Sequence, residues 1–312
     1  MQKIGIVIVN YNCEKDVVDC LTSLYKLDVN DLQVTIYIVD NASPRKESAD
    51  YIESHLFKFQ HKNITCLLTR NSLNSGFTGG YNLGANQAVE DKCDYILILN
   101  PDTFVHSNFL QILVKDAQSH SKYAAILPKI YFAPGFEFHK DRYTTSEKGK
   151  VIWYARGEMD WQNVIGYSRG VDEVDQGQFD NTTETQIATG CCLLIPRKII
   201  EKIGLFSQKY FMYYEDADWS MRAHNAGYKI GFAPSAVIWH KNATSSGGSG
   251  SSLQDYYITR NRLLFGLTYA PFRAKIALIR ESLRLLSQGR KWQKQGVRDY
   301  YLQRFEQGSY AK

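Results

Sequence analysis

The sequence of 312 residues lacks the patterns of cysteine-based and membrane-spanning proteins. Its six cysteines contain no C-x-x-C pair, which argues against a zinc site and against a thioredoxin-like redox motif. We expect them to be reduced thiols of a cytoplasmic protein. No apolar stretch approaches the ~18 residues that a membrane span needs. The opening MQKIGIVIVNYN has the pattern of a strand rather than of a signal peptide.

Positive and negative residues are nearly balanced along the chain except near its C-terminal end. The net charge is +5, yet the residues from Asp255 onward contain twelve Lys or Arg and four Asp or Glu. This segment therefore carries +8 and the preceding part about −3. A mildly acidic body without a nucleic-acid-binding module argues against a nucleic-acid partner.

The remaining composition predicts a packed α/β protein. Hydrophobic residues make up 44% and aromatic residues 13% of the chain, enough for a sizeable core. Strands are predicted at 3–10, 34–39, 64–68 and 95–99, and helices at 14–27, 48–56 and 84–89. Alternation of this kind is typical of a parallel, doubly wound sheet.

The second half of the chain is less regular. Helices are predicted at 109–118, 197–203 and 216–226, strands at 186–196, 228–233 and 236–239, and hairpin segments at 150–155 and 164–169. Residues 134–184 are otherwise irregular. From Leu253 the pattern is continuously helical.

Polar residues follow each of the first four predicted strands. They are Asn10-Tyr11-Asn12, Asp40-Asn41, Asn71 and Asn100-Pro101-Asp102. Because ligands of open α/β sheets lie outside the carboxyl ends of the strands, these residues are expected to build one polar site. Asp102, on a turn stiffened by Pro101, suits a divalent cation that carries phosphate oxygens. The alternative is a polar turn that merely ends a strand.

A glycine-rich stretch, NSGFTGGYNLG, covers Asn74–Gly84. It matches neither the G-x-G-x-x-G of dinucleotide folds nor a P-loop. Its glycines would let the backbone approach a ligand closely. The alternative is a flexible connection with a helix that begins near Tyr81.

A second group of candidate functional residues is the acidic cluster Glu215, Asp216 and Asp218. Such a cluster usually needs a cation or a proton. The alternative is an acidic first turn of a helix, favoured by the helix dipole, in which Asp218 is structural. His240 follows a predicted strand and precedes the low-complexity run Thr244–Ser252, which together suggest an active-site lid; an incidental histidine is the alternative.

The C-terminal segment contains an apolar stripe, Ile276, Ile279, Leu283 and Leu286, beside Arg273, Arg280 and Arg284. A basic amphipathic helix indicates an anionic membrane surface, or else a helix that packs on the domain with a solvated arginine edge. Before this stripe, Arg260 and Arg262 could reach a pyrophosphate or a phosphate of the acceptor.

Seven motifs occur together in a recognisable order: VNYN, VDNAS, NSGFTGGYNLG, LNPDT, TGCCLLIPR, YEDADWSMR and WH. As a set, over residues 3–265, they resemble bacterial family 2 glycosyltransferases of the rhamnosyltransferase-like group. The resemblance implies a GT-A fold with a mostly parallel Rossmann-like sheet. It implies a catalytic domain at 1–265, with a nucleotide-sugar-binding half at 1–105 and an acceptor-binding half at 106–265. Residues 266–312 would form a basic amphipathic helical tail.

The implied activity is inverting transfer of a sugar, L-rhamnose being one candidate, from a nucleotide diphosphate donor. The resemblance implies Asp216 as the general base with Glu215 beside it, and Asp102 and His240 as metal ligands. The nucleotide-binding residues would be Val9, Asn10, Tyr11, Asp40, Asn41, Asn71, Asn74, Gly76, Phe77, Gly80, Asn82, Asn100 and Pro101. The acceptor-binding residues would be Thr189, Gly190, Cys191, Trp219 and Arg260.

One position departs from the family pattern, because Asn100 replaces the first aspartate of the D-x-D motif. One fewer carboxylate predicts weaker affinity for the cation, Mn²⁺ or Mg²⁺. The expected partners are a dTDP- or UDP-linked donor, a glycan or polyprenyl-linked acceptor of surface polysaccharide synthesis, and the inner face of the plasma membrane. A non-catalytic nucleotide-sugar-binding module remains the alternative. A nucleotidyltransferase would instead need a basic, glycine-rich loop where Tyr11–Glu14 stands.

Overall fold

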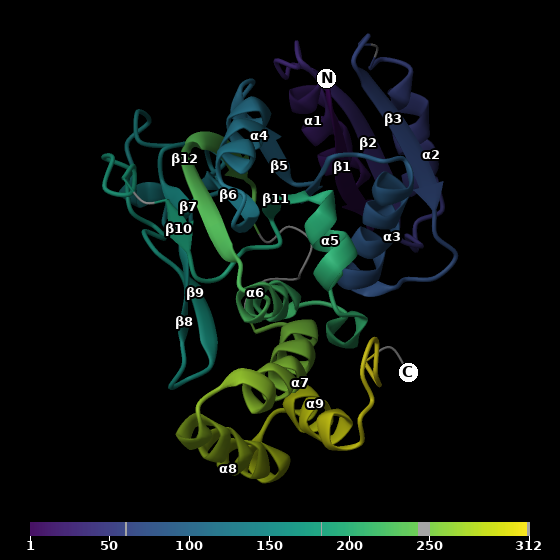
Figure 1. Ribbon diagram of the computed structural model, residues 1–312. Helices are drawn as coiled ribbons and strands as arrows, with labels where there is room; N and C mark the ends of the chain where they lie inside the picture. The colour runs from purple at the N-terminus through teal and green to yellow at the C-terminus, as the bar shows by residue number, and fades with distance from the viewer. Residues whose placement is uncertain (60, 182, 243–249, 311–312) are drawn as a thin grey trace.

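The computed structural model describes residues 1–59, 61–181, 183–242 and 250–310. Within them the chain is organised around a large mixed sheet with strand order β10-β12-β6-β11-β4-β1-β2-β3, in which β5 pairs with β12 and β7 with β6. Helices flank this sheet, and a further layer of C-terminal helices lies at one end of the molecule (Figure 1). The predicted α/β class is confirmed.

The N-terminal half supplies parallel strands and the helices between them. They are β1 (Gln2–Asn10), α1 (Glu14–Leu24), β2 (Leu32–Asp40), α2 (Glu47–Leu56), β3 (Ile64–Arg70), α3 (Gly76–Glu90) and β4 (Tyr95–Leu99). In the register of β1 on β2, Asn10 lies opposite Asp40, and in that of β2 on β3, Asp40 lies opposite Arg70. The polar strand ends therefore meet at one edge of the sheet, as predicted.

The second half continues the same sheet. Its elements are β5 (Thr103–Val105), α4 (Phe109–Ser119), β6 (Tyr123–Phe132), β7 (Ile152–Tyr154), β8 (Gly157–Asp160), β9 (Ile165–Ser168), β10 (Glu184–Thr185), β11 (Cys192–Pro196), α5 (Arg197–Ile203), α6 (Glu215–Asn225) and β12 (Lys229–His240). Strand β11 runs antiparallel to β4, and β12 runs parallel to β6. The two halves therefore share one sheet.

Several predicted strands differ from the observed ones. The strands expected at 228–233 and 236–239 are a single strand, β12, with an irregular register between Ala233 and Val237. The strand expected at 186–196 begins only at Cys192, and β6 was not predicted at all. Of the two segments predicted as hairpins, 164–169 contains β9, which forms a hairpin with β8, whereas β7 in 150–155 pairs with β6 of the main sheet.

The glycine-rich stretch is helical rather than a loop. Helix α3 begins at Gly76, eight residues before the predicted start at Gly84. Its small residues let the helix approach β1 closely, because a Cβ on Gly84 would lie 2.4 Å from Val7 Cγ1 and one on Gly80 would lie 2.9 Å from Val9 Cγ1. Close packing of helix on strand therefore explains these glycines better than flexibility does.

The C-terminal segment consists of α7 (Ser252–Tyr269), α8 (Phe272–Gln288) and α9 (Lys291–Tyr301). The prediction of continuous helix was wrong, because Pro271 and Gly289 have extended backbone and separate the three helices. The predicted boundary after residue 265 cuts through α7, and Val164 of the body shares an apolar core with Leu278 and Val297. No helix of the described residues is long and apolar enough to cross a membrane.

Candidate active site

Asparagines organise the edge of the sheet where β1, β2 and β3 end. Asn10 Nδ2 donates to Asp40 Oδ1 at 2.6 Å and to Ser48 Oγ at 2.9 Å. Asn41 Oδ1 accepts from Asn71 Nδ2 at 3.1 Å, while its Nδ2 donates to the carbonyl of Gly76 at 2.9 Å. Asn41 thereby fixes the start of α3 against the strand ends, which gives the edge a defined shape.

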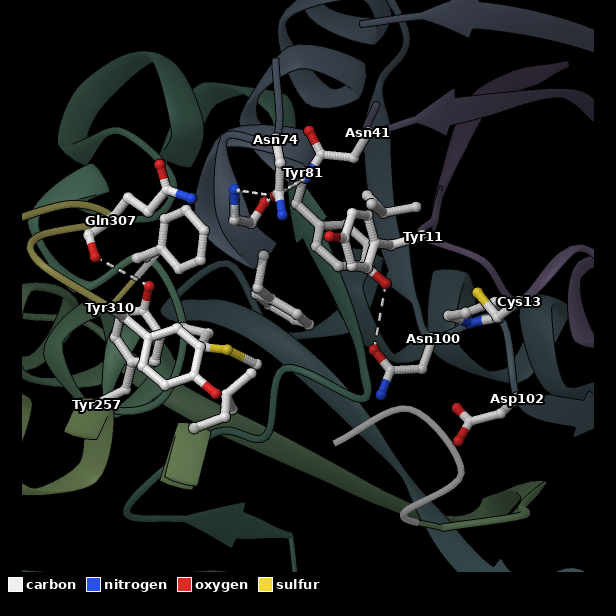
Figure 2. Close-up of a pocket in the computed structure, with 17 residues that line it drawn as sticks. Tyr11, Cys13, Asn41, Asn74, Tyr81, Asn100, Asp102, Tyr257, Gln307 and Tyr310 are labelled. Carbon is white, nitrogen blue, oxygen red and sulfur yellow. Dashed lines mark hydrogen bonds between the residues drawn. The ribbon is translucent and has the colours of Figure 1, made fainter. Parts of the chain in front are cut away.

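A cavity of about 270 Å³ opens in front of this edge (Figure 2). Most of the predicted nucleotide-binding residues line it: Val9, Tyr11, Asn41, Asn74, Gly76, Phe77, Asn100 and Pro101. Asp102 also lines it, so the predicted metal ligand and the predicted nucleotide residues share one cavity. Polar side chains of Asn41, Asn74, Asn100 and Asp102 line it among apolar ones, outside the carboxyl ends of the strands, where ligands of open α/β sheets bind.

Five other predicted nucleotide-binding residues, Asn10, Asp40, Asn71, Gly80 and Asn82, do not line this cavity. The first three belong to the asparagine network behind it, and Gly80 packs on Val9. Asn82 ties α3 to Phe206, donating to its carbonyl at 2.7 Å and accepting from its N–H at 3.1 Å. These positions support the cavity wall rather than form its surface.

Sequence reasoning did not assign eight residues that line the cavity: Cys13, Tyr81, Phe211, Met212, Leu253, Tyr257, Gln307 and Tyr310. Tyr81 lies within the glycine-rich motif, and its hydroxyl donates to Leu99 O at 3.0 Å and to Asn100 Oδ1 at 3.1 Å. Gln307 and Tyr310 come from the segment after α9. No motif marks that segment, so nothing in the sequence could have placed it here.

Asp102 and His240 are brought together by the pairing of β5 with β12, and both are buried. His240 Nε2 lies 3.1 Å from Asp102 Oδ1. Burial raises the pKa of Asp102, but the adjacent His240 outweighs it and the net pKa is lowered. Burial lowers the pKa of His240, whereas Cys191 and Asp102 raise it, to about 10. Each of the two groups therefore favours the charged form of the other.

These two residues fit a divalent cation by their chemistry. His240 Nδ1 is buried without a hydrogen-bond partner among the described residues, and carboxylate and imidazole are common ligands of Mn²⁺. No group of three or more His, Cys, Asp or Glu side chains is placed to hold a metal ion in the described part of the chain. A cation bound here would therefore need further ligands from the substrate and from water. The lid predicted at 244–252 lies largely outside the described residues.

The loop before α6 has unusual backbone geometry. Phe211, Tyr213 and Tyr214 have φ of 65°, 66° and 71°, although none is glycine. Such conformations cost of order 1–3 kcal/mol each and cluster at functional sites. Asn261 Nδ2 holds the loop by donating to the carbonyls of Tyr210, Met212 and Tyr213 at 2.7–2.9 Å. The strained turn delivers the carboxylates of α6 to fixed positions.

The three carboxylates of this helix have different environments. Asp216 Oδ2 accepts from the Gly190 N–H at 3.0 Å, and burial raises its pKa. Burial and the charge of Asp216 raise the pKa of Glu215 well above its ordinary value, and Glu215 Oε2 is buried with no hydrogen-bond partner in the part of the chain that the structure describes. Asp218 instead accepts from Arg222 at 2.8 Å and from Tyr269 at 3.0 Å. Asp218 is thus structural, and Asp216 is the carboxylate available for chemistry.

A second cavity, of about 440 Å³, adjoins Asp216. Thr189 and Arg262 line it, together with Ile165 and Tyr167 of β9. Gly190, whose N–H binds Asp216, also lies close to the first cavity, since a Cβ there would lie 3.0 Å from Phe77, which lines that cavity. Asp216 therefore lines the second cavity, and Gly190 lies next to both Asp216 and Phe77.

Two predicted acceptor-binding residues lie in the packed interior. Trp219 is fully buried, and its indole N–H donates to Gly204 O at 3.1 Å. Arg260 is also fully buried, and its guanidinium donates to the backbone carbonyls of Tyr210 and Glu306. Neither side chain can reach an acceptor, so both stabilise the fold and do not have the predicted role in acceptor binding. Cys191 is buried beside His240.

The sequence is similar to those of known sugar transferases. Low-salt glycan biosynthesis hexosyltransferase Agl10 of Haloferax volcanii is 24% identical over 85% of this chain and 75% of its own. A Mycobacterium tuberculosis N-acetylglucosaminyl-diphospho-decaprenol L-rhamnosyltransferase is 39% identical over 20% of this chain and 21% of its own.

The fold agrees with that of a solved glycosyltransferase. The crystal structure of GalNAc-T7 with UDP, GalNAc and Mn²⁺ superposes with a TM-score of 0.64 at 18% identity, over 96% of this chain and 55% of that one. The family model for glycosyl transferase family 2 matches residues 5–204. The chain therefore belongs to glycosyl transferase family 2 and is a glycosyltransferase with a GT-A fold.

Proposed function

We propose that the chain transfers a sugar with inversion from a nucleoside diphosphate donor to a hydroxyl of a glycan or lipid-linked glycan in surface polysaccharide synthesis. The observation that carries this proposal is the position of Asp216, which lines the second cavity and is held on the N–H of Gly190, next to Phe77 of the first cavity. The donor would occupy the cavity lined by Asn41 and Asp102, and the acceptor the cavity lined by Thr189 and Arg262.

In this mechanism Asp216 accepts the proton of the acceptor hydroxyl as that oxygen attacks the anomeric carbon. One carboxylate base suffices for inversion, because no covalent intermediate forms. Burial and the charge of Asp216 raise the pKa of Glu215, and of the two carboxylates Asp216 lines the acceptor cavity, so we assign the base to Asp216. Asp102 and His240 would hold a divalent cation, which stabilises the negative charge of the departing diphosphate when bound.

The donor remains to be identified, and a thermal-shift panel does this directly. The M. tuberculosis relative is named for L-rhamnose and the GalNAc-T7 structure contains UDP, which makes dTDP-L-rhamnose and UDP-sugars the first candidates. At a hundred times its dissociation constant, a donor adds about 2.7 kcal/mol of stability. We expect one donor to raise the melting temperature, and to do so more with Mn²⁺ than with EDTA.

The controls in the panel separate two readings of the site. A shift that is equal with Mn²⁺ and EDTA would retain the donor site and remove the cation from it. No shift with any donor would contradict nucleotide-sugar binding, and with it the transferase mechanism proposed above.

We further propose that α8 contacts an anionic membrane surface. Two residues of the predicted stripe, Ile279 and Leu283, are 42% and 59% exposed, and Phe272 at the start of the helix is 77% exposed. The other two, Ile276 and Leu286, are partly buried, and Leu286 packs on the core of the C-terminal helices. Ala274, Leu278 and Ser282 face the protein. Arg273, Arg280 and Arg284 are exposed along the same helix. Apolar side chains between arginines fit a surface of anionic headgroups.

The acceptor cavity lies close to this surface. Ile165 lines that cavity, and Val164, its neighbour in the β8–β9 hairpin, packs in one core with Leu278 of α8. Figure 1 shows the hairpin reaching toward the layer of C-terminal helices. A lipid-linked acceptor held in the membrane would therefore have a short path to Asp216.

The double variant Ile279→Glu with Leu283→Glu tests the membrane contact. Both side chains are exposed, so folding should persist, whereas binding to phosphatidylglycerol-containing vesicles should fall by about tenfold or more. Co-sedimentation measures the bound fraction. Leu67→Glu is the matched control, since Leu67 is 44% exposed on β3, in the N-terminal half of the chain. Equal binding of the double variant and the wild type would contradict the proposal.

A further inference from the structure

The segment that follows α9 returns to the donor cavity. Residues 303–310, which we call the hook, turn back from α9 toward the body of the protein (Figure 1). Gln307 and Tyr310 of the hook line the same cavity as Asn41 and Asp102. In Figure 2 they lie with Tyr257 on the side of the cavity opposite Tyr11 and Asp102.

Specific hydrogen bonds fix the hook on α7 and α9. The fully buried Asp299 accepts from the Ser309 N–H at 2.9 Å and from the Ser309 hydroxyl at 3.1 Å. Tyr257 donates its hydroxyl proton to Gln307 O at 3.1 Å, and Arg260 Nη1 donates to Glu306 O at 2.8 Å. The buried carboxylate of Asp299 and the buried guanidinium of Arg260 both bind this short segment, which gives the hook a definite position.

Aromatic packing then orients Tyr310. Its ring centroid lies 4.8 Å from that of Trp292, 5.5 Å from that of Tyr257 and 5.6 Å from that of Tyr256. Tyr257 in turn stacks on Phe211 at 5.1 Å, and Phe211 lines the cavity. The hook therefore continues an aromatic wall that begins in the strained loop before α6.

Arg260 links the hook to that loop directly. The same guanidinium donates to Tyr210 O at 3.0 Å and to Glu306 O at 2.8 Å. A second link is the Glu306 N–H, which donates to Lys209 O at 3.1 Å. The position of the hook and the geometry of the loop that presents Asp216 are thus held by shared contacts.

We infer that the hook is part of the donor-binding site, in which Tyr310 and Gln307 contact the bound nucleotide sugar. The inference rests on the proposed function, because it requires the first cavity to hold that donor. Donor binding and hook docking are then coupled, each favouring the other.

Two substitutions test this by different routes. Tyr310→Ala removes the aromatic side chain from the cavity wall. Gly308→Ala keeps every lining side chain but displaces the hook, because Gly308 has φ of +57° and its Cβ would lie 2.0 Å from the Tyr256 hydroxyl. We expect each variant to bind UDP or dTDP about tenfold more weakly than the wild type does.

Two controls match these changes. Leu302→Ala removes an exposed side chain just before the hook, outside the cavity. Gly135→Ala places an alanine at a positive φ of +87°, and among the described residues no atom beyond its chain neighbours lies within 4 Å of its Cβ, so it reproduces backbone strain without a clash. Both should bind nucleotide within about twofold of the wild type.

Calorimetric titration with UDP and dTDP, and hydrogen exchange of residues 303–310 with and without nucleotide, measure the coupling. We expect nucleotide to slow exchange in the hook of the wild type. If the wild type binds neither nucleotide, the proposed function fails and this inference falls with it. If the wild type binds while Tyr310→Ala and Gly308→Ala bind equally well, only the inference is overturned. Should Gly308→Ala not fold, Tyr310→Ala alone decides.

Discussion

Asp216→Asn is expected to lower the turnover rate by about 10²–10⁴-fold and to leave donor affinity unchanged. An asparagine oxygen still accepts the Gly190 N–H, which Asp216 Oδ2 accepts at 3.0 Å, so the turn before α6 should keep its shape. The amide cannot take the proton of the acceptor hydroxyl. The rate of nucleoside diphosphate release measures turnover, and calorimetric titration measures donor affinity.

Asp218→Asn is the matched control within the same acidic cluster. Asp218 accepts from Arg222 and Tyr269 and lines neither cavity, so its loss should lower the melting temperature and spare turnover at a permissive temperature. A turnover rate of Asp216→Asn within about threefold of the wild type would place the general base elsewhere.

The pH dependence of turnover provides a second readout of the same base. Burial raises the pKa of Asp216, and a general base must be ionised to act. Turnover should therefore rise with pH through a pKa above the ordinary ~3.9 of aspartate. Asp216→Asn should lose this acid limb. An acid limb that persists in the variant would have to come from another group.

Arg260→Leu is expected to lower the free energy of unfolding by about 3–5 kcal/mol without raising the KM of the acceptor. The fully buried guanidinium donates to carbonyls of the loop before α6 and of the hook, and leucine would leave those carbonyls unpaired. Urea-induced unfolding measures the stability change, and steady-state kinetics below the unfolding midpoint measures KM.

Arg262→Ala provides the contrast two residues away. Arg262 lines the acceptor cavity and pairs with Glu281 at 3.0 Å in a partly exposed ion pair. Its loss should cost at most about 1 kcal/mol of stability and should raise the KM of the acceptor. If Arg260→Leu retained wild-type stability and raised this KM instead, the acceptor role expected from the sequence would be restored.

Much of the fold could be predicted from local sequence patterns. Each of the first four strands is a short apolar run followed by polar residues, so both the strand and the edge where it ends could be predicted. The second half was harder. Strand β6 contains Pro128 and Lys129, which interrupt its apolar run. Lys129 is buried because Asp175 lies 2.7 Å and Asp180 2.5 Å away, and partners so distant in sequence leave no local signal.

In the candidate site, too, residues in local motifs could be predicted and residues placed by distant contacts could not. Asp102 and Asp216 stand in short, recognisable motifs, and the structure places both beside cavities. Arg260 was predicted to bind the acceptor, because an arginine in a helix gives no sign that a loop 50 residues earlier will bury it. The hook went unpredicted for a similar reason. Tyr310 lines the same cavity as Val9 and Tyr11, which stand near the other end of the chain, and no spacing in the sequence reveals this.

The donor cavity is lined by residues from both ends of the chain, which determines when it can form during translation. Its wall joins Val9 to Tyr310, so every ribosome must make about 200 residues after completing the nucleotide-binding half before the cavity can close. At ~5–20 residues per second this takes about 10–40 s. During that time the nascent chain has the polar edge of its first strands without the residues of the hook that complete the cavity wall.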